Sequence, residues 1–362
     1  MRARTFTLLA VIALVAAACG PEQTAESTTT APVLEETTTT APPAEAVLLS
    51  YSLEAGSSYT YEVDLDQSID LTATGDPTAL GEEEIPGEMA IQIAGTSVFT
   101  HSVAAGPEPE TYAVTITGDF SDIELSGTVD GEPVSSDDIP EFAAMEPVDV
   151  TIVVDAQGNL IPDESGLGED LLGDLGGLGA LDQLGSGAGI GQFVGPPFTE
   201  EEVAVGDTWS ETIEVPTLPG DAPVTTQIDS VVTGTDTVDG SEVFVIETTT
   251  TTSAIEFDLA EVLIGLMTGF LPEEATDEER AEMEALAAQL RFVFSIDEST
   301  ADLTTLFDHE AGLARQAEFS STTHMVMDVN IPDETTGELV EFGMDMNLSQ
   351  SVVYRLTSAD ST

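Results

Sequence analysis

Cysteine, lysine and histidine are almost absent from this sequence. Its 362 residues include one cysteine, three histidines and no lysine, and six arginines stand against 69 Asp and Glu, which gives a formal charge of −63. A single cysteine cannot form a disulfide within one chain. A surface so poor in basic groups repels nucleic acid and anionic lipid headgroups, so neither is an expected partner.

The residues that usually perform catalysis form no recognisable constellation. Asp308, His309 and Glu310 are adjacent, but alternate residues of a strand point to opposite faces, and the pattern predicts a structural turn instead of a metal site. His101 and His324 have no recurring partners along the chain. Carboxylates are so numerous that no pair of them stands out as a catalytic acid and base.

Two further kinds of site are excluded by missing motifs. The Gly-x-Ser-x-Gly motif of serine hydrolases is absent, and Gly185-Ser186-Gly187 lacks the strand-to-helix context that such a nucleophile needs. The glycine-rich stretch 163–199 contains no basic residue to meet a phosphate, which excludes a nucleotide-binding loop. The sequence therefore predicts a non-enzymatic protein with no catalytic residues, no cofactor and no metal site.

The N-terminus has the pattern of an export signal. Arg2 and Arg4 precede an apolar run over residues 6–15, and small residues at 16–18 lead to Cys19. The alternative, a membrane anchor helix, is disfavoured because the run is too short to span a bilayer and polar chain follows it. Residues 1–18 are therefore predicted to be a cleaved signal peptide.

The cleavage site also contains the only cysteine. Ala16-Ala17-Ala18-Cys19 resembles the lipobox of bacterial lipoproteins, in which the cysteine is acylated and becomes the new N-terminus. Acyl chains contribute about 0.8 kcal/mol per buried methylene, so several of them hold a protein firmly on a bilayer. The expected location is the outer face of the cell membrane, with the membrane bound through acyl chains on Cys19.

Removal of the signal peptide makes the charge more extreme. Four arginines then stand against 69 acids, a formal charge of −65. We interpret this charge as a solvated surface with loosely bound cations, suited to a saline exterior. Dedicated Ca²⁺ sites are the alternative, although Asp64-Leu65-Asp66 is only a fragment of an EF-hand loop.

After a linker, the dominant pattern is that of β-strands. Residues 19–46 are rich in Thr, Pro, Glu and Ala and are predicted to be a disordered linker. Beyond them, apolar and polar residues alternate in 59–65, 89–93, 148–154 and in one long strand over 112–125. Strands with one apolar face are typical of antiparallel sheets with one wet face.

The second half of the chain repeats the order of the first. Three pairs of segments correspond: 56–61 with 206–211, 112–125 with 243–257, and 151–158 with 304–312. We predict one β-rich domain over residues 47–357, in two similar halves of about 47–162 and 203–357 that are joined by the Gly/Leu-rich segment 163–199. Convergent hairpin chemistry is the alternative explanation of the similarity.

Two segments interrupt the β pattern. Apolar residues at helical spacing in 259–270 and a capping box that begins at Thr276 predict two helices separated by Pro272. Segment 163–199 also has leucines at helical spacing, but each interior glycine costs a helix about 1 kcal/mol. We expect these helical insertions to cover the concave face of a large curved antiparallel sheet. The leucines expected to line a ligand site there are Leu171, Leu175 and Leu178.

A methionine-rich hairpin is predicted near the C-terminus. A turn around residues 332–337 pairs 323–329 with 340–347, which places His324 and Asp345 on one face. The opposite face consists of Met325, Met327, Phe342, Met344 and Met346. Methionine adapts to varied apolar partners, so this face is either ordinary core or the lining of an adaptable apolar cavity. Cu(I) binding by thioethers is a third possibility without support from any cysteine.

Several short motifs accumulate along the chain. They are the lipobox, the Thr/Pro-rich stalk, the Gly56-x-x-Tyr59 opening, Pro196-Pro197, and Val203-x-Val205-Gly206-Asp207-Thr208-Trp209. Together they resemble a family of uncharacterised actinobacterial lipoproteins. The layout also resembles the lipoprotein-carrier superfamily, in which a strongly curved antiparallel sheet wraps helices and holds lipids or acyl chains. These resemblances imply an envelope lipoprotein that binds or carries an apolar or amphiphilic ligand. The alternative is a structural or protein-interaction module of the envelope without a small-molecule ligand.

Overall fold

The described part of the protein is almost entirely β. The computed structural model describes residues 46–75, 86–109, 111–118, 122–138, 148–158, 161, 198–215, 224–258, 291–332 and 339–360. The only helical element within these ranges is the short 3₁₀ turn Ser136–Asp138. The predicted signal peptide, Cys19, and the predicted helices within 163–197 and 259–290 lie outside the described residues. The prediction of a mainly β protein with a large antiparallel sheet is confirmed.

The strands are long and every pairing between them is antiparallel. They are β1 (Val47–Leu48), β2 (Ser58–Gly75), β3 (Glu88–Ala105), β4 (Thr111–Gly118), β5 (Ile123–Val129), β6 (Glu132–Ser135), β7 (Val148–Asp155), β8 (Glu202–Val203), β9 (Thr208–Val215), β10 (Val224–Val238), β11 (Ser241–Thr252), β12 (Ile255–Asp258), β13 (Arg291–Ile296), β14 (Ser299–Asp308), β15 (Leu313–Pro332) and β16 (Leu339–Asp360). β1 pairs with β8, and the other strands form one 14-stranded sheet.

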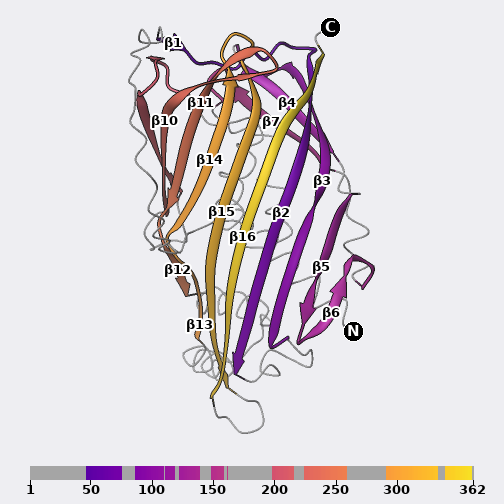
Figure 1. Cartoon of the computed structure of the whole chain (residues 1–362). Helices are drawn as coiled ribbons and strands as arrows, with labels where there is room; N and C mark the ends of the chain where they lie inside the picture. Colours follow the sequence, from indigo (N-terminus) through magenta and orange to yellow (C-terminus); the bar gives the residue numbers. More distant parts are fainter. Residues whose placement is uncertain are drawn as a thin grey trace, which may run out of the picture.

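The main path through this sheet is β6-β5-β3-β2-β16-β15-β14-β11-β10-β9 (Figure 1). The first long strand and the last strand are therefore neighbours at its centre. β4 also pairs with β3 and then with β7, while β13 pairs with β15 and then with β12. We call the end where β2 begins and β16 finishes the upper end of the sheet, and the opposite end the lower end.

The prediction of a single long strand over residues 112–125 is wrong in one respect. The described residues form two strands that both pair with β3, namely β4, which pairs with Phe99–Ala105, and β5, which pairs with Met89–Gly95. The division lets each piece pair outward with a different strand, β4 with β7 and β5 with β6. A periodicity of two cannot show such a change of partner, because both pieces keep the same alternation.

Two parts of the sheet share one strand order. The paths β2-β3-β4-β7 and β9-β10-β11-β14 are both antiparallel, and the segments that correspond in sequence occupy equivalent places in them. Each path opens with the same backbone contacts. The Gly56 amide donates to the carbonyl of Val103 at 2.9 Å, and the Gly206 amide donates to that of Val232 at 2.7 Å. Both glycines have a φ near +98°, at 98° and 97°, where a side chain would be strained.

One face of the sheet is buried, and alternation keeps that face constant along each strand. In β2 the side chains of Tyr59, Tyr61 and Val63 point inward, and so do those of Ile69 and Leu71 much further along. The side chains between them point to the opposite face and are mostly half-buried or exposed. The alternation continues over the whole strand, because β2 pairs with β3 in one unbroken register. Its pairing with β16 has a single register shift, between Leu356 and Ser358 near the upper end.

Residues 46–57, which we call the strap, cross the upper end of the sheet (Figure 1). The Tyr51 amide donates to the carbonyl of Ala156, just after β7, at 2.7 Å, and the Ser52 amide donates to that of Gly312, just before β15, at 3.0 Å. Gly312 has a φ of 65°, and the backbone of Ser52 leaves no room for a Cβ there. The strap therefore joins two distant parts of the sheet.

These two hydrogen bonds require the upper end of the sheet to bend. Ala156 follows β7 and Gly312 precedes β15, and these two strands are five pairings apart, which corresponds to roughly 24 Å in a flat sheet. Adjacent amides such as those of Tyr51 and Ser52 lie within about 3.6 Å of each other, so the two carbonyls they reach lie within about 10 Å. A flat sheet cannot satisfy both contacts, and the upper end must bend around the strap.

The inward face contains two separate apolar clusters. The upper cluster includes side chains of the strap, Leu49, Tyr51 and Leu53, together with Phe198 and inward residues of the sheet. The lower cluster consists of Ile69, Leu71, Met89, Ile91, Leu125, Val224, Ile255, Ile296, Met325, Met346 and Leu348. Within the described ranges, every member of the lower cluster comes from a strand of the large sheet.

Candidate ligand-binding face

β15 and β16 pair as the predicted methionine hairpin. Met325 is opposite Met346, Met327 is opposite Met344, and Val329 is opposite Phe342 across β15 and β16. Residues directly opposite in an antiparallel pair share a face, so the five predicted residues all point inward. Met325 and Met346 belong to the lower cluster, and Met344 packs at its margin. Met327 and Phe342 lie further toward the lower end, outside that cluster.

The sequence did not identify the rest of this face. Met89 on β3 and Leu71 on β2 continue the row that Met325 and Met346 begin. Ile296 on β13 is the next member on the other side. Alternation marked 89–93 as a strand, but only the register of β2 with β16 places its apolar side chains beside the hairpin. The other predicted lining residues, Leu171, Leu175 and Leu178, lie outside the described residues.

A band of buried polar side chains separates the two apolar clusters. Its members, which we call the polar band, are Gln67, Gln350, Ser321, Thr323, Ser299 and Thr252. Gln67 is opposite Gln350, and Gln350 is opposite Ser321, so these three side chains form one row. Thr323 and Ser299 lie just beyond the last pair of β14 with β15. All but the half-buried Gln350 are less than one-tenth exposed.

Among the described residues, two buried hydroxyls on the inward face have no hydrogen-bond partner. One is Oγ1 of Thr323, a residue that is 1% exposed and stands opposite Leu348 of the lower cluster. The other is Oγ1 of Thr305, which lies between Ala317 and Ile246 in the upper half of the sheet. An unpartnered buried hydroxyl is destabilising, and valine would fill the same space without that cost. Of the two, only Thr323 belongs to the polar band and borders the lower cluster.

The upper end is filled by aromatic side chains. Tyr51 stacks on Phe198 with ring centroids 4.8 Å apart, and both rings contact Phe307 edge-on. The rings of Tyr61 and His101 lie 4.8 Å apart beside a hollow only about as large as a water molecule. Burial lowers the pKa of His101 to about 4 and raises that of Tyr61. We assign these described side chains to packing, because the hollow beside them is too small for an organic ligand.

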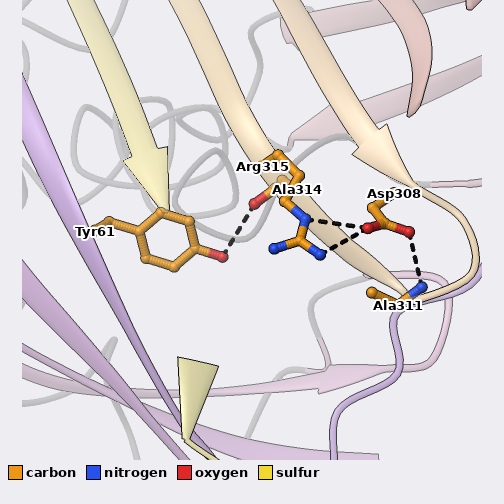
Figure 2. Close-up of polar contacts among 5 residues, drawn as sticks. All are labelled: Tyr61, Asp308, Ala311, Ala314 and Arg315. Atoms are coloured by element: carbon orange, nitrogen blue, oxygen red, sulfur yellow. Dashed lines mark hydrogen bonds and ion pairs between the residues drawn. The ribbon is translucent and has the colours of Figure 1, made fainter. Parts of the chain in front are cut away.

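Polar contacts beside this aromatic group hold the turn between β14 and β15 (Figure 2). The Asp308 carboxylate accepts hydrogen bonds from the Ala311 amide at 2.9 Å and from the Arg315 guanidinium at 2.7 Å. The Tyr61 hydroxyl donates a long hydrogen bond of 3.5 Å to the Ala314 carbonyl. Burial alone would raise the pKa of Asp308, but the Ala311 amide and Arg315 outweigh it and hold that pKa below its usual value.

His309 occupies the turn that the sequence predicted, and its ring lies 5.0 Å from that of Phe244. Within the described ranges, no three His, Cys, Asp or Glu side chains are close enough together to hold a metal ion.

His324 has partners that the sequence analysis did not find. Its Nδ1 lies 2.6 Å from a carboxylate oxygen of Asp297, and its Nε2 lies 3.2 Å from one of Asp345. Hydrogen bonding to Asp297 is the main cause that raises the pKa of His324, and Asp345 adds to it. The hairpin register already put His324 and Asp345 on one face, whereas Asp297 comes from the loop between β13 and β14. This group lies on the outer face, away from the lower cluster.

Comparisons with known proteins identify no relative. No protein-family model and no curated protein matches this sequence. Among solved structures, OccK7 (OpdD) of Pseudomonas aeruginosa aligns over 83% of this chain and 99% of its own, with 7% identity and a TM-score of 0.19. The Salmonella type III secretion secretin InvG aligns over 84% of this chain and 61% of its own, with 8% identity and a TM-score of 0.15. Similarities this weak assign neither fold family nor function.

The resemblance to actinobacterial lipoproteins and to lipoprotein carriers therefore stays a prediction. In the described part of the chain, no helix is both long and apolar enough to cross a membrane.

Proposed function

We propose that this protein is a non-enzymatic envelope lipoprotein, tethered through Cys19, that binds or carries an apolar or amphiphilic molecule against the lower cluster. The observation that supports the proposal most is the composition of that cluster. Three of its side chains are methionines from three different strands, β3, β15 and β16, and the described chain contributes only sheet residues to it. The upper cluster, by contrast, is completed by the strap and Phe198.

Methionine-rich surfaces suit ligands of variable shape. The thioether side chain is unbranched and polarizable, so it repacks around different apolar groups at little cost. Each ligand methylene that leaves water for such a surface gains roughly 0.8 kcal/mol. The row from Met89 through Leu71 and Met346 to Met325 crosses four adjacent strands, and Met344 extends it toward the lower end. This continuous surface is wide enough to bind more than a single side chain.

The proposal also includes the segments of the chain that cover the lower cluster. Side chains of the lower cluster are less than one-tenth exposed, so chain other than the described strands must cover them, or the sheet must close over them. From their leucine spacing, we propose that residues 163–199 and 259–290 lie over this concave face. The repeated strand order supports two similar halves, each with one such insertion.

The alternative is a structural or protein-interaction module without a small-molecule ligand. One observation favours it. β9 is the last strand on its side of the described sheet, and Ile213 on β9 and Val205 just before it are 39% and 43% exposed. An edge strand with exposed apolar side chains is a template for pairing with another chain. In this case the lower cluster is ordinary core.

Extraction of the purified full-length protein separates the two functions. We expect organic solvent to release an apolar or amphiphilic molecule in near-stoichiometric amount, detected by mass spectrometry. The delipidated protein should then bind an apolar fluorescent dye. A protein that releases no such molecule and binds no dye contradicts the proposal and favours the interaction module.

A pair of variants on one strand locates the binding face. Met346 and Val352 are both buried and both point inward from β16, but Met346 belongs to the lower cluster and Val352 to the upper one. Met346→Ala should weaken dye binding about fivefold, because roughly 1 kcal/mol of apolar contact is lost. Val352→Ala should lower the melting temperature without changing dye affinity. Equal effects of the two variants on dye binding would place the dye elsewhere.

A further inference from the structure

We infer that the ligand is an amphiphile with an uncharged, hydrogen-bonding polar group, which lies at the polar band while its apolar chain lies along the lower cluster. This inference rests on the proposed function and adds the chemical class of the ligand. Its basis is that hydroxyls and amides lie at the upper border of the lower cluster, where a simple core would have apolar side chains.

The polar band is placed where the ligand would change from polar to apolar. Gln67 on β2 and Gln350 on β16 are directly opposite, and the next inward pair toward the lower end is Ile69 with Leu348. Thr323 stands beside Leu348, and the following pair is Met325 with Met346. Within two residues along each of these strands the inward face changes from amides and hydroxyls to apolar side chains, which are Ile69, Leu348 and Met325. Thr323 Oγ1, which has no partner, is on this boundary.

The chemistry of the band points to an uncharged head. None of its six members is ionisable, and hydroxyls and amides both donate and accept hydrogen bonds. Arg355 points to the outer face, where it pairs with Asp64, and Arg315 is bound to Asp308 at the upper end. Arg291 is exposed at the start of β13, so no arginine of the described strands lies at the band. Against these strands a phosphate or carboxylate would be buried without a countercharge, which is strongly unfavourable. Hydroxyl groups, such as those of a glycerol ester or a sugar, match the band.

The dimensions of the face agree with an acyl chain. From Thr323 to Val329, the last inward residue of β15 with a buried partner in β16, the strand rises about 20 Å. The hydrocarbon layer of one membrane leaflet, which one acyl chain spans, is roughly 15 Å thick. A single acyl chain that starts at the polar band is therefore shorter than the stretch of inward face from Thr323 to Val329.

Competition between two probes of equal chain length tests the inference. A long-chain glycerol monoester and the free fatty acid of the same chain are titrated against the dye bound to delipidated protein at pH 8, where the fatty acid is ionised. We expect the monoester to displace the dye at a concentration at least tenfold lower than the fatty acid, because only its head finds partners without a buried charge.

The buried threonines provide a matched pair of variants. Thr323→Val and Thr305→Val each remove an unpartnered buried hydroxyl from the inward face, but only Thr323 borders the lower cluster. Thr323→Val should weaken monoester binding about fivefold, the loss of one hydrogen bond, and leave fatty-acid binding unchanged. Thr305→Val should change neither. Should Thr323→Val fail to fold, Gln67→Leu tests the same prediction from β2.

The outcomes distinguish this inference from the function on which it rests. If neither the dye nor either probe binds the wild-type protein, the proposed function fails and the inference fails with it. If both probes bind but the fatty acid binds as tightly as the monoester, the carrier function stands and the uncharged head is wrong. Equal responses of Thr323→Val and Thr305→Val overturn the placement of the head at the polar band.

Discussion

At the scale of single residues, burial decides how a side chain titrates. His101 and His324 are alike in the sequence, since neither has a recurring partner there. His101 points inward at the upper end, where burial lowers its pKa to about 4. His324 points outward between Asp297 and Asp345, and hydrogen bonds to these carboxylates raise its pKa. The two histidines therefore affect stability with opposite signs as the pH changes.

The buried His101 should make the protein sensitive to acid. Between pH 6.5 and 4 the unfolded chain binds a proton at this residue that the folded protein does not, so stability falls as the pH falls. The loss reaches up to about 3 kcal/mol at pH 4. We expect His101→Gln to remove this component, so that the difference in unfolding free energy between wild type and variant shrinks across this window. Denaturant titrations at pH 7 and pH 4.5 measure it, and a constant difference would contradict a neutral buried His101.

At the scale of elements, the turn between β14 and β15 depends on one carboxylate. Asp308 is 3% exposed and satisfies both the Ala311 amide and the Arg315 guanidinium. Arg315 is partly exposed, so water screens the pair, and we expect Asp308→Ala to destabilise the protein by about 2 kcal/mol, below the range for fully buried pairs. Thermal unfolding provides the measurement.

The same turn supplies the control for that variant. Glu310 is exposed and lies two residues away, so Glu310→Ala should change stability by less than about 0.5 kcal/mol. If the two variants are equally stable, the buried contacts of Asp308 do not hold the turn.

A comparison of the predicted elements with the observed ones shows what the alternation pattern can and cannot predict. It predicted most of the strands, the turn at His309 and the shared methionine face of the β15–β16 hairpin, because each of these depends on residues close in sequence. It did not predict the division of 112–125 into β4 and β5, since the division depends on which strands lie alongside. It also missed the row that joins Met89 and Leu71 to Met346.

At the scale of the whole molecule, repulsion between the negative charges opposes the folding of the sheet. The predicted mature chain has a formal charge of −65, and a curved sheet brings the acids of neighbouring strands into one compact body. Screening shortens the reach of the repulsion from about 10 Å at 0.1 M salt to about 3 Å at 1 M. The melting temperature should therefore rise between dilute buffer and 1 M NaCl, by about 2–4 °C for each kcal/mol gained. A melting temperature that is indifferent to salt would contradict this prediction.

Calcium separates general screening from specific binding. If the acids hold cations only loosely, CaCl₂ and NaCl should stabilise the protein equally at the same ionic strength. A large rise in melting temperature at low millimolar Ca²⁺ alone would instead indicate dedicated sites.

The tether is also a property of the whole molecule. Cys19→Ser should prevent acylation, so that the protein leaves the detergent phase on phase partitioning and is recovered in the aqueous phase. A variant that partitions with detergent as the wild-type protein does would show that the anchor is not the lipid on Cys19. The strap follows directly after the linker, so a tether there would attach at the upper end, away from the lower cluster.

The sequence by itself determined the β class of the protein, most of the strands and the methionine face of the last hairpin. These follow from alternation and from turns between strands that are close in the chain, where a short loop fixes the register. The polar band, the contact of His324 with Asp297 and the contacts of the strap emerge only in the folded protein. Gln67 meets Gln350, and the strap joins Ala156 to Gly312, through pairings between strands that are far apart in sequence. Alternation fixes which face a residue points to, but it contains no information about which distant strand lies beside it.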